Sequence, residues 1–144
     1  MTQRHFTQND TAMLVTTNIK NRYPLFEHSP YAREAVEQIY RTKSSLPFFL
    51  FGFVVMPDHV HFLLHVPSPA TVSGVMRTYK MGLSFQTGIA PLWQRRFHIR
   101  LAKNPHGALA YIHNNPVAAH LVVSPADYAW SSASGKWDID PLPW

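Results

Sequence analysis

Hydrophobic side chains are densest in two neighbouring stretches of the chain, Phe48 to Met56 and His59 to Val66. The first stretch is almost wholly apolar, whereas polar and apolar residues begin to alternate in the second. Both stretches are rich in β-branched and aromatic residues, which favour strands. Only Pro57 and Asp58 separate them, and so short a connection predicts an antiparallel hairpin at the centre of the molecule.

Further elements are predicted on both sides of this hairpin. Ser29-Pro30 is typical of a helix start, and the residues after it place their apolar side chains on one helical stripe. Asn104-Pro105 predicts another helix start, and Pro116 predicts the end of that helix. The predicted elements are a strand over Ala12 to Ile19, a helix over Tyr31 to Tyr40, a helix over about Ala70 to Gln86, an extended segment over Trp93 to Leu101 and a helix from Pro105 to about Asn114.

The resulting order of strands and helices predicts an α+β fold. We expect a ferredoxin-like antiparallel sheet with the helices packed on one face. The histidines of the second hairpin strand would then face a cleft or the third helix. A chain of 144 residues suits one domain over 1–144, in which about 1–11 and 133–144 are peripheral.

Several classes of protein and site are excluded by composition and patterning. The chain has no cysteine, which excludes disulfides, a thiolate metal site and a cysteine nucleophile. The N-terminal residues lack the apolar core of a signal peptide, and the apolar run near Phe48 is too short to span a bilayer. We therefore expect a soluble, cytoplasmic protein with no membrane partner.

The charged residues are unevenly distributed along the chain, whose formal net charge is +5. No acidic residue occurs from His59 to Ala126. The same span contains six basic residues, which are Arg77, Lys80, Arg95, Arg96, Arg100 and Lys103. A basic, acid-free middle with several aromatic residues favours a nucleic acid partner. An ordinary solvated basic face is the alternative.

His59 and His61 are the first candidates for a chemical role. Residues two apart in a strand point to the same face, so the two imidazoles lie side by side and can converge on one cation. Histidines on an apolar strand are also compatible with a purely structural role in the core. His65 lies two positions further along, which favours a structural or supporting role.

Tyr111 and Asn115 are a second pair, in the predicted third helix. They are four residues apart and therefore on one helical face. A phenol beside a metal site on a basic surface can attack a phosphodiester. The link is reversible because a phenol, with a pKa of about 10, leaves more readily than a sugar alkoxide. Imidazole and amide ligands together suit Mn²⁺ or Mg²⁺. A packing tyrosine and a simple helix stop are the alternatives.

Four blocks in this order resemble the REP-associated tyrosine transposases, within the single-tyrosine HUH transposases of the insertion-sequence type. HUH denotes two histidines around a hydrophobic residue, here His59-Val60-His61. The triplet alone is a weak signal, whereas the four blocks together are specific. They are Val54 to Leu64, Leu92 to Phe97, Tyr111 to Val117, and Trp130-Ser131-Ser132.

The resemblance implies roles for particular residues. His59 and His61 would bind a divalent metal, Tyr111 would be the nucleophile, and Asn115 would be a further metal ligand. It also implies cleavage of single-stranded DNA at hairpins, leaving a 5′-phosphotyrosine and a free 3′-OH, followed by rejoining. The residues expected to contact this DNA are Arg77, Lys80, Trp93, Arg95, Arg96 and Arg100.

Two features of the sequence leave questions open. Relatives commonly carry Asn where this chain has Asp58, so an additional negative charge lies beside the expected metal site. The chain also ends without a long basic tail, which leaves open how much of a hairpin it grips. A monomer and a homodimer are both compatible with the sequence.

Two other functions compete with a strand transferase. One is an inactive or domesticated module that binds DNA hairpins without cutting them, although all the motif residues are present. The other is a metal hydrolase acting on a small phosphoester, which would need a carboxylate base. Within the central part of the chain, only Asp58 could supply that carboxylate.

Overall fold

Four strands form one antiparallel sheet in the computed structural model, which describes residues 8–143. The strands lie in the spatial order β2-β3-β1-β4. The predicted hairpin is present, since Pro57 and Asp58 alone join β2 to β3. The bounds are Ala12–Ile19 for β1, Phe49–Met56 for β2, His59–His65 for β3 and Trp93–Leu101 for β4.

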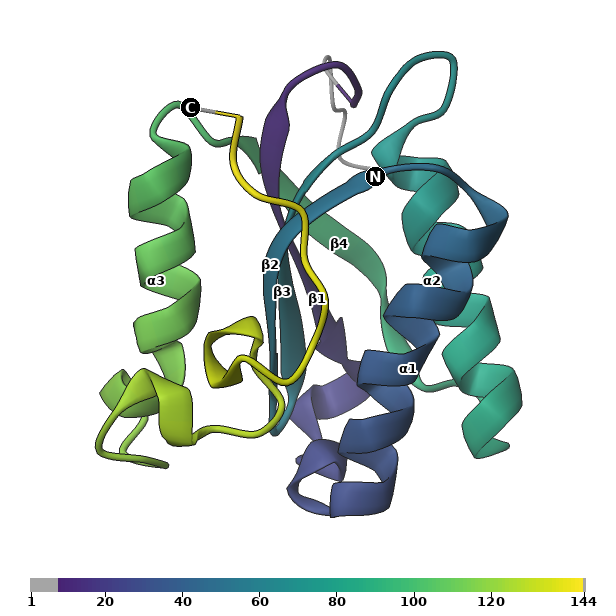
Figure 1. The fold of residues 1–144 in the computed structure, drawn as a ribbon. Coiled ribbons are helices and arrows are strands. Elements are labelled where there is room, and N and C mark those ends of the chain that lie inside the picture. The colour runs from purple at the N-terminus through teal and green to yellow at the C-terminus, as the bar shows by residue number, and fades with distance from the viewer. Residues whose placement is uncertain (1–7, 144) are drawn as a thin grey trace.

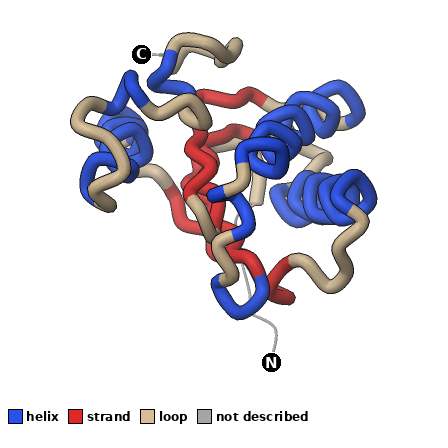
Figure 2. Tube along the Cα trace, turned by 90° about the horizontal axis from the view of Figure 1, so that it is seen from below, coloured by secondary structure: helices blue, strands red, loops and turns tan. Residues whose placement is uncertain are grey.

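Three helices cover the sheet: α1 (Ser29–Ser45), α2 (Val72–Thr87) and α3 (Pro105–Ala118). The α+β class and the strand, helix, strand, strand, helix, strand order are confirmed. The expectation that the helices share one face is wrong for α3. Figure 1 shows α1 and α2 on one side of the sheet and α3 on the other, and Figure 2 shows the same three layers from below.

The physical reason for this second layer is that the sheet is apolar on both faces. Most of the buried side chains lie between the sheet and helices α1 and α2. A smaller buried cluster lies on the opposite face and includes Leu14, Val54, Leu63 and, from α3, Ile112. An apolar sheet face is stable only when another element covers it, so α3 is required there.

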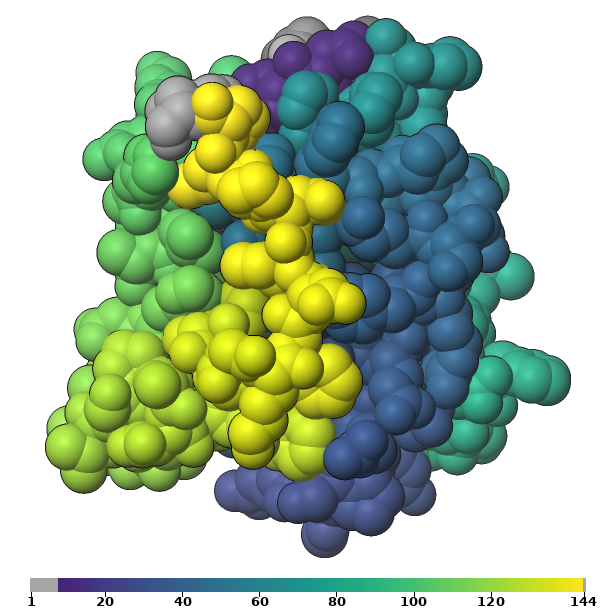
Figure 3. All heavy atoms as spheres, in the orientation of Figure 1, coloured from purple at the N-terminus to yellow at the C-terminus, as the bar shows by residue number. Residues whose placement is uncertain are grey.

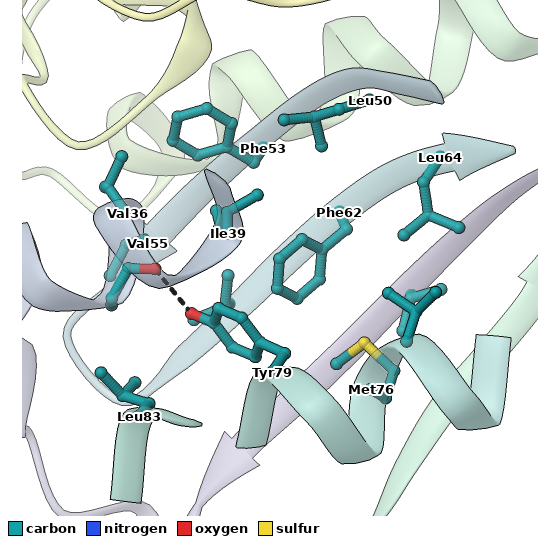
Figure 4. Close-up of a cluster of buried hydrophobic side chains, with 14 of the residues drawn as sticks. Val36, Ile39, Leu50, Phe53, Val55, Phe62, Leu64, Met76, Tyr79 and Leu83 are labelled. Carbon is teal, nitrogen blue, oxygen red and sulfur yellow. Dashed lines mark hydrogen bonds between the residues drawn. The ribbon is translucent and has the colours of Figure 1, made fainter. Parts of the chain in front are cut away.

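The larger cluster forms the main core of the protein. Figure 4 shows Phe53 and Phe62 of the sheet facing Ile39 of α1 and Tyr79 of α2. The Tyr79 hydroxyl is fully buried and donates a hydrogen bond of 2.9 Å to the carbonyl oxygen of Ala35. This bond joins α1 to α2 across the core and satisfies a polar group that would otherwise be costly to bury.

Close packing fixes α3 on strand β2. A side chain at Gly52 would collide with Leu109 of α3, so glycine permits this approach. The helix also continues past the predicted end, because Pro116 is buried within its last turn. The carbonyls of this turn are still used, since the N–H groups of Ala119 and Leu121 bond to those of Asn115 and Pro116.

The C-terminal segment follows the outer edge of β2. Figure 3 shows it as a band between α3 and α1. Backbone N–H groups of β2 are bonded by the Trp130 carbonyl at 2.8 Å, the Ser132 hydroxyl at 3.0 Å and the Asp140 carboxylate at 2.8 Å. The segment therefore covers an edge that could otherwise pair with another chain.

The structure bears on two further expectations, one about peripheral segments and one about membrane-spanning segments. Residues 1–7 of the expected peripheral start lie outside the described residues. Among residues 8–143, no helix has the length and apolar character needed to cross a membrane.

Candidate active site

Strand β3 places His59 and His61 on the face of the sheet that α3 covers in part. Their Nε2 atoms are 3.2 Å apart, and their ring centroids are 4.7 Å apart. Strand pairing sets Thr16 of β1 opposite His61, and His98 of β4 opposite Thr16. A row of three side chains from three strands therefore crosses the sheet at this level.

Each imidazole is held through its Nδ1 atom. His59 Nδ1 lies 2.6 Å from Asp58 Oδ1, and His61 Nδ1 lies 2.7 Å from Thr16 Oγ1. An ionised carboxylate only accepts hydrogen bonds, so the contact with Asp58 is a hydrogen bond when His59 carries its proton on Nδ1, which leaves a lone pair at Nε2. The Thr16 hydroxyl can donate or accept, and His61 presents a second lone pair when its own Nδ1–H donates to Thr16.

The charges around the two imidazoles favour a neutral His61 and an ionised Asp58. Burial is the main cause that lowers the pKa of His61 to about 3, and the charges of His59, Arg100 and Arg22 add to it. Partial burial by itself would raise the pKa of Asp58. The hydrogen bonds and charges of Arg22 and His59 outweigh that effect and lower the pKa.

Helix α3 brings Tyr111 and Asn115 to the same place. The Tyr111 ring centroid is 5.7 Å from that of His61, and the side chain is 49% exposed. An open hollow of about 560 Å³ in front of the sheet is lined by His59, His61, His98, Tyr111, Asn115 and Arg22, among others. A second hollow of about 210 Å³ adjoins Tyr111 and His61 and includes Arg100. The sequence-predicted His pair and the Tyr and Asn pair therefore share one site.

The helix that carries Tyr111 is anchored by His113. Its Nε2 lies 2.8 Å from the Ser132 hydroxyl, which also accepts from the backbone N–H of Phe53 at 3.0 Å. Burial lowers the pKa of His113. Since His113 faces the sheet, it fixes the helix, and Tyr111 on another side of the helix is left exposed to the hollow.

The two imidazoles fit a divalent cation. Two nitrogen ligands at right angles on one ion, each at about 2.1 Å, lie about 3 Å apart, which agrees with the 3.2 Å between the Nε2 atoms. Within residues 8–143, no three side chains from His, Cys, Asp or Glu form a metal-binding group. A third protein ligand would therefore be of another type, and the Asn115 amide oxygen in the same hollow is available for that role.

The residues expected to contact DNA fall into separate groups. Arg100 lines the smaller hollow beside Tyr111, and Arg96 points to the same face by strand alternation. Arg77, Lys80 and Arg95 line a groove between α2 and β4, towards the opposite face. The Lys80 ammonium there donates to the carbonyl oxygens of Gln94 and Arg95 at 2.9 and 3.4 Å.

Trp93 belongs to the core. Its side chain packs against Phe26 and Tyr79, and the residue is 8% exposed. Its indole N–H donates to the carbonyl oxygen of Lys80 at 3.2 Å. A ring buried on both sides cannot stack on a DNA base, so we assign Trp93 to the core and not to the DNA contact surface.

Three residues of the site have no signal in the sequence that links them to it. Thr16 lies opposite His61, and His98 lies opposite Thr16, only through the pairing of β1 with β3 and β4. Arg22 reaches Asp58, 36 positions along the chain, with its Nε 2.9 Å from Asp58 Oδ2. The basic and aromatic character of β4 indicated a functional strand, but only the sheet register identifies His98.

This chain is similar in sequence and in structure to known proteins. The family described as "Transposase IS200 like" matches residues 8–115. A REP-associated tyrosine transposase of Escherichia coli K12 is 29% identical, over 87% of this chain and 81% of the relative. The structure of a REP-associated tyrosine transposase bound to a REP hairpin superposes with a TM-score of 0.79. That match covers 100% of this chain and 94% of the other at 24% identity, and it shows a shared fold.

Proposed function

The chain belongs to the IS200-like transposase family, and on that premise we propose that it cleaves and rejoins single-stranded DNA at hairpins through Tyr111. The observation that carries the proposal is the position of Tyr111. Its ring lies 5.7 Å from that of His61, in a hollow that His59 and Asn115 also line. A nucleophile and a candidate metal site therefore face the same open space.

Tyr111 performs the covalent step. Its phenol oxygen attacks the scissile phosphorus, the phenol proton passes to solvent, and the bond between phosphorus and the 3′ oxygen breaks. The released 3′ oxygen takes up a proton to become a 3′-OH, and the phosphate stays linked to Tyr111 and to the downstream 5′ oxygen. Rejoining reverses these steps, with a 3′-OH as the nucleophile and the phenol as leaving group.

The chain's own side chains would hold Mn²⁺ or Mg²⁺ in this site. His59 and His61 would contribute Nε2, and Asn115 its amide oxygen. A bound cation would polarise a nonbridging oxygen and stabilise negative charge on the scissile phosphate. Thr16 and Asp58 hold the imidazoles in place from behind, so their orientation does not depend on the substrate.

A hairpin substrate is supported by the relative whose structure is described as bound to a REP hairpin. The local charge of this chain agrees with a DNA strand at the site. Arg100 lines the smaller hollow beside Tyr111, and Arg22 lines the larger one. These two arginines favour a phosphate backbone that passes over the nucleophile.

The proposal is tested by covalent capture. The protein is incubated with Mn²⁺ and labelled single-stranded hairpin DNA, and a denaturing gel is used to detect an adduct. Tyr111→Phe removes the attacking oxygen and is expected to abolish the adduct while hairpin binding persists. Tyr23→Phe is the matched control, because Tyr23 is similarly exposed, at 57%, but does not line either hollow at the site.

The metal is tested in the same assay. Chelation of divalent ions and the His61→Ala substitution are each expected to abolish the adduct, and Mn²⁺ should restore activity only to the chelated wild-type protein. An adduct that survives Tyr111→Phe would contradict the nucleophile assignment. Binding of many hairpins without any adduct in the wild-type protein would instead identify a hairpin-binding module.

A further inference from the structure

We propose that Arg22 and Asp58 are positioning residues for His59, which fix the proton of its ring on Nδ1 so that Nε2 is presented to the metal. The inference rests on the proposed function, because it assigns a purpose to the orientation of a metal ligand. The same inference gives a role to Asp58, the additional acidic residue that precedes the paired histidines in this chain.

The Asp58 carboxylate bridges two partners. Oδ1 lies 2.6 Å from His59 Nδ1, and Oδ2 accepts from Arg22 Nε at 2.9 Å. Arg22 therefore occupies the second oxygen and leaves the first for the imidazole. The terminal guanidinium nitrogen of Arg22 is 3.5 Å from His59 Nδ1. If Nδ1 carries the ring proton, both atoms are donors and this contact is not a hydrogen bond.

The backbone around Arg22 is arranged for this contact. Asn21 and Arg22 have φ angles of 59° and 54°, both in the left-handed region that L-residues rarely adopt. The same segment is tied to the hairpin turn by two backbone hydrogen bonds of 2.9 Å, from Ile19 to the Asp58 carbonyl and from Phe26 to the Pro57 carbonyl. A strained turn held at both ends delivers Arg22 to Asp58.

A contribution to stability alone does not account for this arrangement. The Arg22 side chain is 51% exposed, and exposed ion pairs add little to folding stability. The backbone conformation at Asn21 and Arg22 is itself unfavourable. Its cost offsets part of what the ion pair between Arg22 and Asp58 contributes to folding stability. A role in orienting His59 accounts for the contact, since carboxylate partners set the tautomer of metal-binding histidines.

Arg22 and Asp58 have opposite charges and separate roles. The contact with His59 uses one carboxylate oxygen of Asp58 and leaves the other for a second partner. Arg22 neutralises the carboxylate and occupies that oxygen, which keeps Asp58 on the imidazole. The pair therefore positions His59 without adding a carboxylate ligand to the site.

The first test is nitrogen-15 NMR of the histidine rings in metal-free protein, at a pH where both imidazoles are neutral. The wild-type His59 ring is expected to carry its proton on Nδ1. Asp58→Ala should shift the proton to Nε2, and Arg22→Gln should shift the populations in the same direction by less. Once Asp58 is alanine, Arg22→Gln should shift no further population to Nε2.

The second test is Mn²⁺ affinity measured by calorimetry without DNA. Loss of such a partner typically weakens metal binding about 10 to 100-fold, which is the expectation for Asp58→Ala. Asp58→Asn keeps an acceptor for Nδ1–H and should fall between Asp58→Ala and the wild type. Arg33→Gln is the matched control, since it removes a similarly exposed arginine of an ion pair on α1.

The proposal is overturned if the metal-free wild-type ring carries its proton on Nε2. It is equally overturned if Asp58→Ala leaves the tautomer unchanged and Mn²⁺ affinity within about twofold, a change well below that expected for a lost partner. If Asp58→Ala does not fold, Asp58→Asn with Arg22→Gln supplies the same comparison. Neither readout involves DNA, so failure of the strand-transfer proposal would leave this result standing, and the reverse also holds.

Discussion

The two imidazoles of the site have different partners behind them. His59 is supported by a carboxylate, and His61 by the neutral hydroxyl of Thr16. His61 is also the more buried of the two, at 7% exposure. A charged partner makes the His59 ring a stronger electron donor, whereas His61 is held by its surroundings. The two proposed metal ligands are therefore expected to respond differently to loss of their partners.

Trp93 gives a prediction at this scale. Trp93→Ala removes a large ring between Phe26 and Tyr79, and should lower the free energy of unfolding by about 3 to 5 kcal/mol, as for other large core deletions. Denaturant unfolding followed by circular dichroism measures the change. Unchanged stability together with lost hairpin binding would return Trp93 to the DNA contact surface.

At the scale of elements, α3 holds its position through contacts at β2 and in the C-terminal segment. The Tyr128 hydroxyl donates to the Val55 carbonyl oxygen at 2.7 Å, and Ser132 contacts both His113 and the backbone of Phe53. The segment that follows α3 thus returns to β2 and secures the helix that carries Tyr111. A change in this segment is therefore expected to alter how firmly α3, and with it Tyr111, is held.

Ser132→Ala tests this connection. The substitution leaves the buried Phe53 N–H and the His113 ring nitrogen without their partner, and an unsatisfied buried group costs about 1 to 3 kcal/mol. Thermal or denaturant unfolding should show that loss, and hydrogen exchange should show faster opening of α3. Ser134→Ala is the control, because its hydroxyl accepts only from the exposed Lys136 backbone. Equal behaviour of the two variants would contradict the anchoring role.

At the scale of the whole molecule, the two faces of the sheet serve different purposes. Helices α1 and α2 bury one face in the main core. Helix α3 packs on β2 and leaves the part of the other face that carries Thr16, His61 and His98 open to a hollow. All the candidate residues come from one chain, so Tyr111 and the two imidazoles meet without a second copy.

Salt dependence tests how the molecule meets DNA. Hairpin affinity should fall as salt rises, and Arg100→Ala should reduce the slope of log affinity against log salt by about 0.7 to 0.9, as for one lost phosphate contact. Fluorescence anisotropy at several salt concentrations measures the slope. Arg33→Ala on α1 should leave it unchanged. A slope insensitive to Arg100 would remove this arginine from the DNA path.

Local patterns in the sequence determined much of this protein. Periodicity located the strands, with β1 and β4 at their observed bounds. Spacing placed His59 beside His61 and Tyr111 on the same face as Asn115. These features depend on neighbours two to four residues apart, whose geometry is fixed by the strand or helix itself.

Only the tertiary structure decided how these elements combine. The register of β1 with β3 and β4 placed Thr16 opposite His61 and His98 opposite Thr16. The apolar second face of the sheet packs against α3, which therefore lies on the side of the histidines. Packing placed Trp93 in the core, and a left-handed turn delivered Arg22 to Asp58. Such contacts join residues far apart in the chain, and they follow from which surfaces bury each other, which local periodicity does not encode.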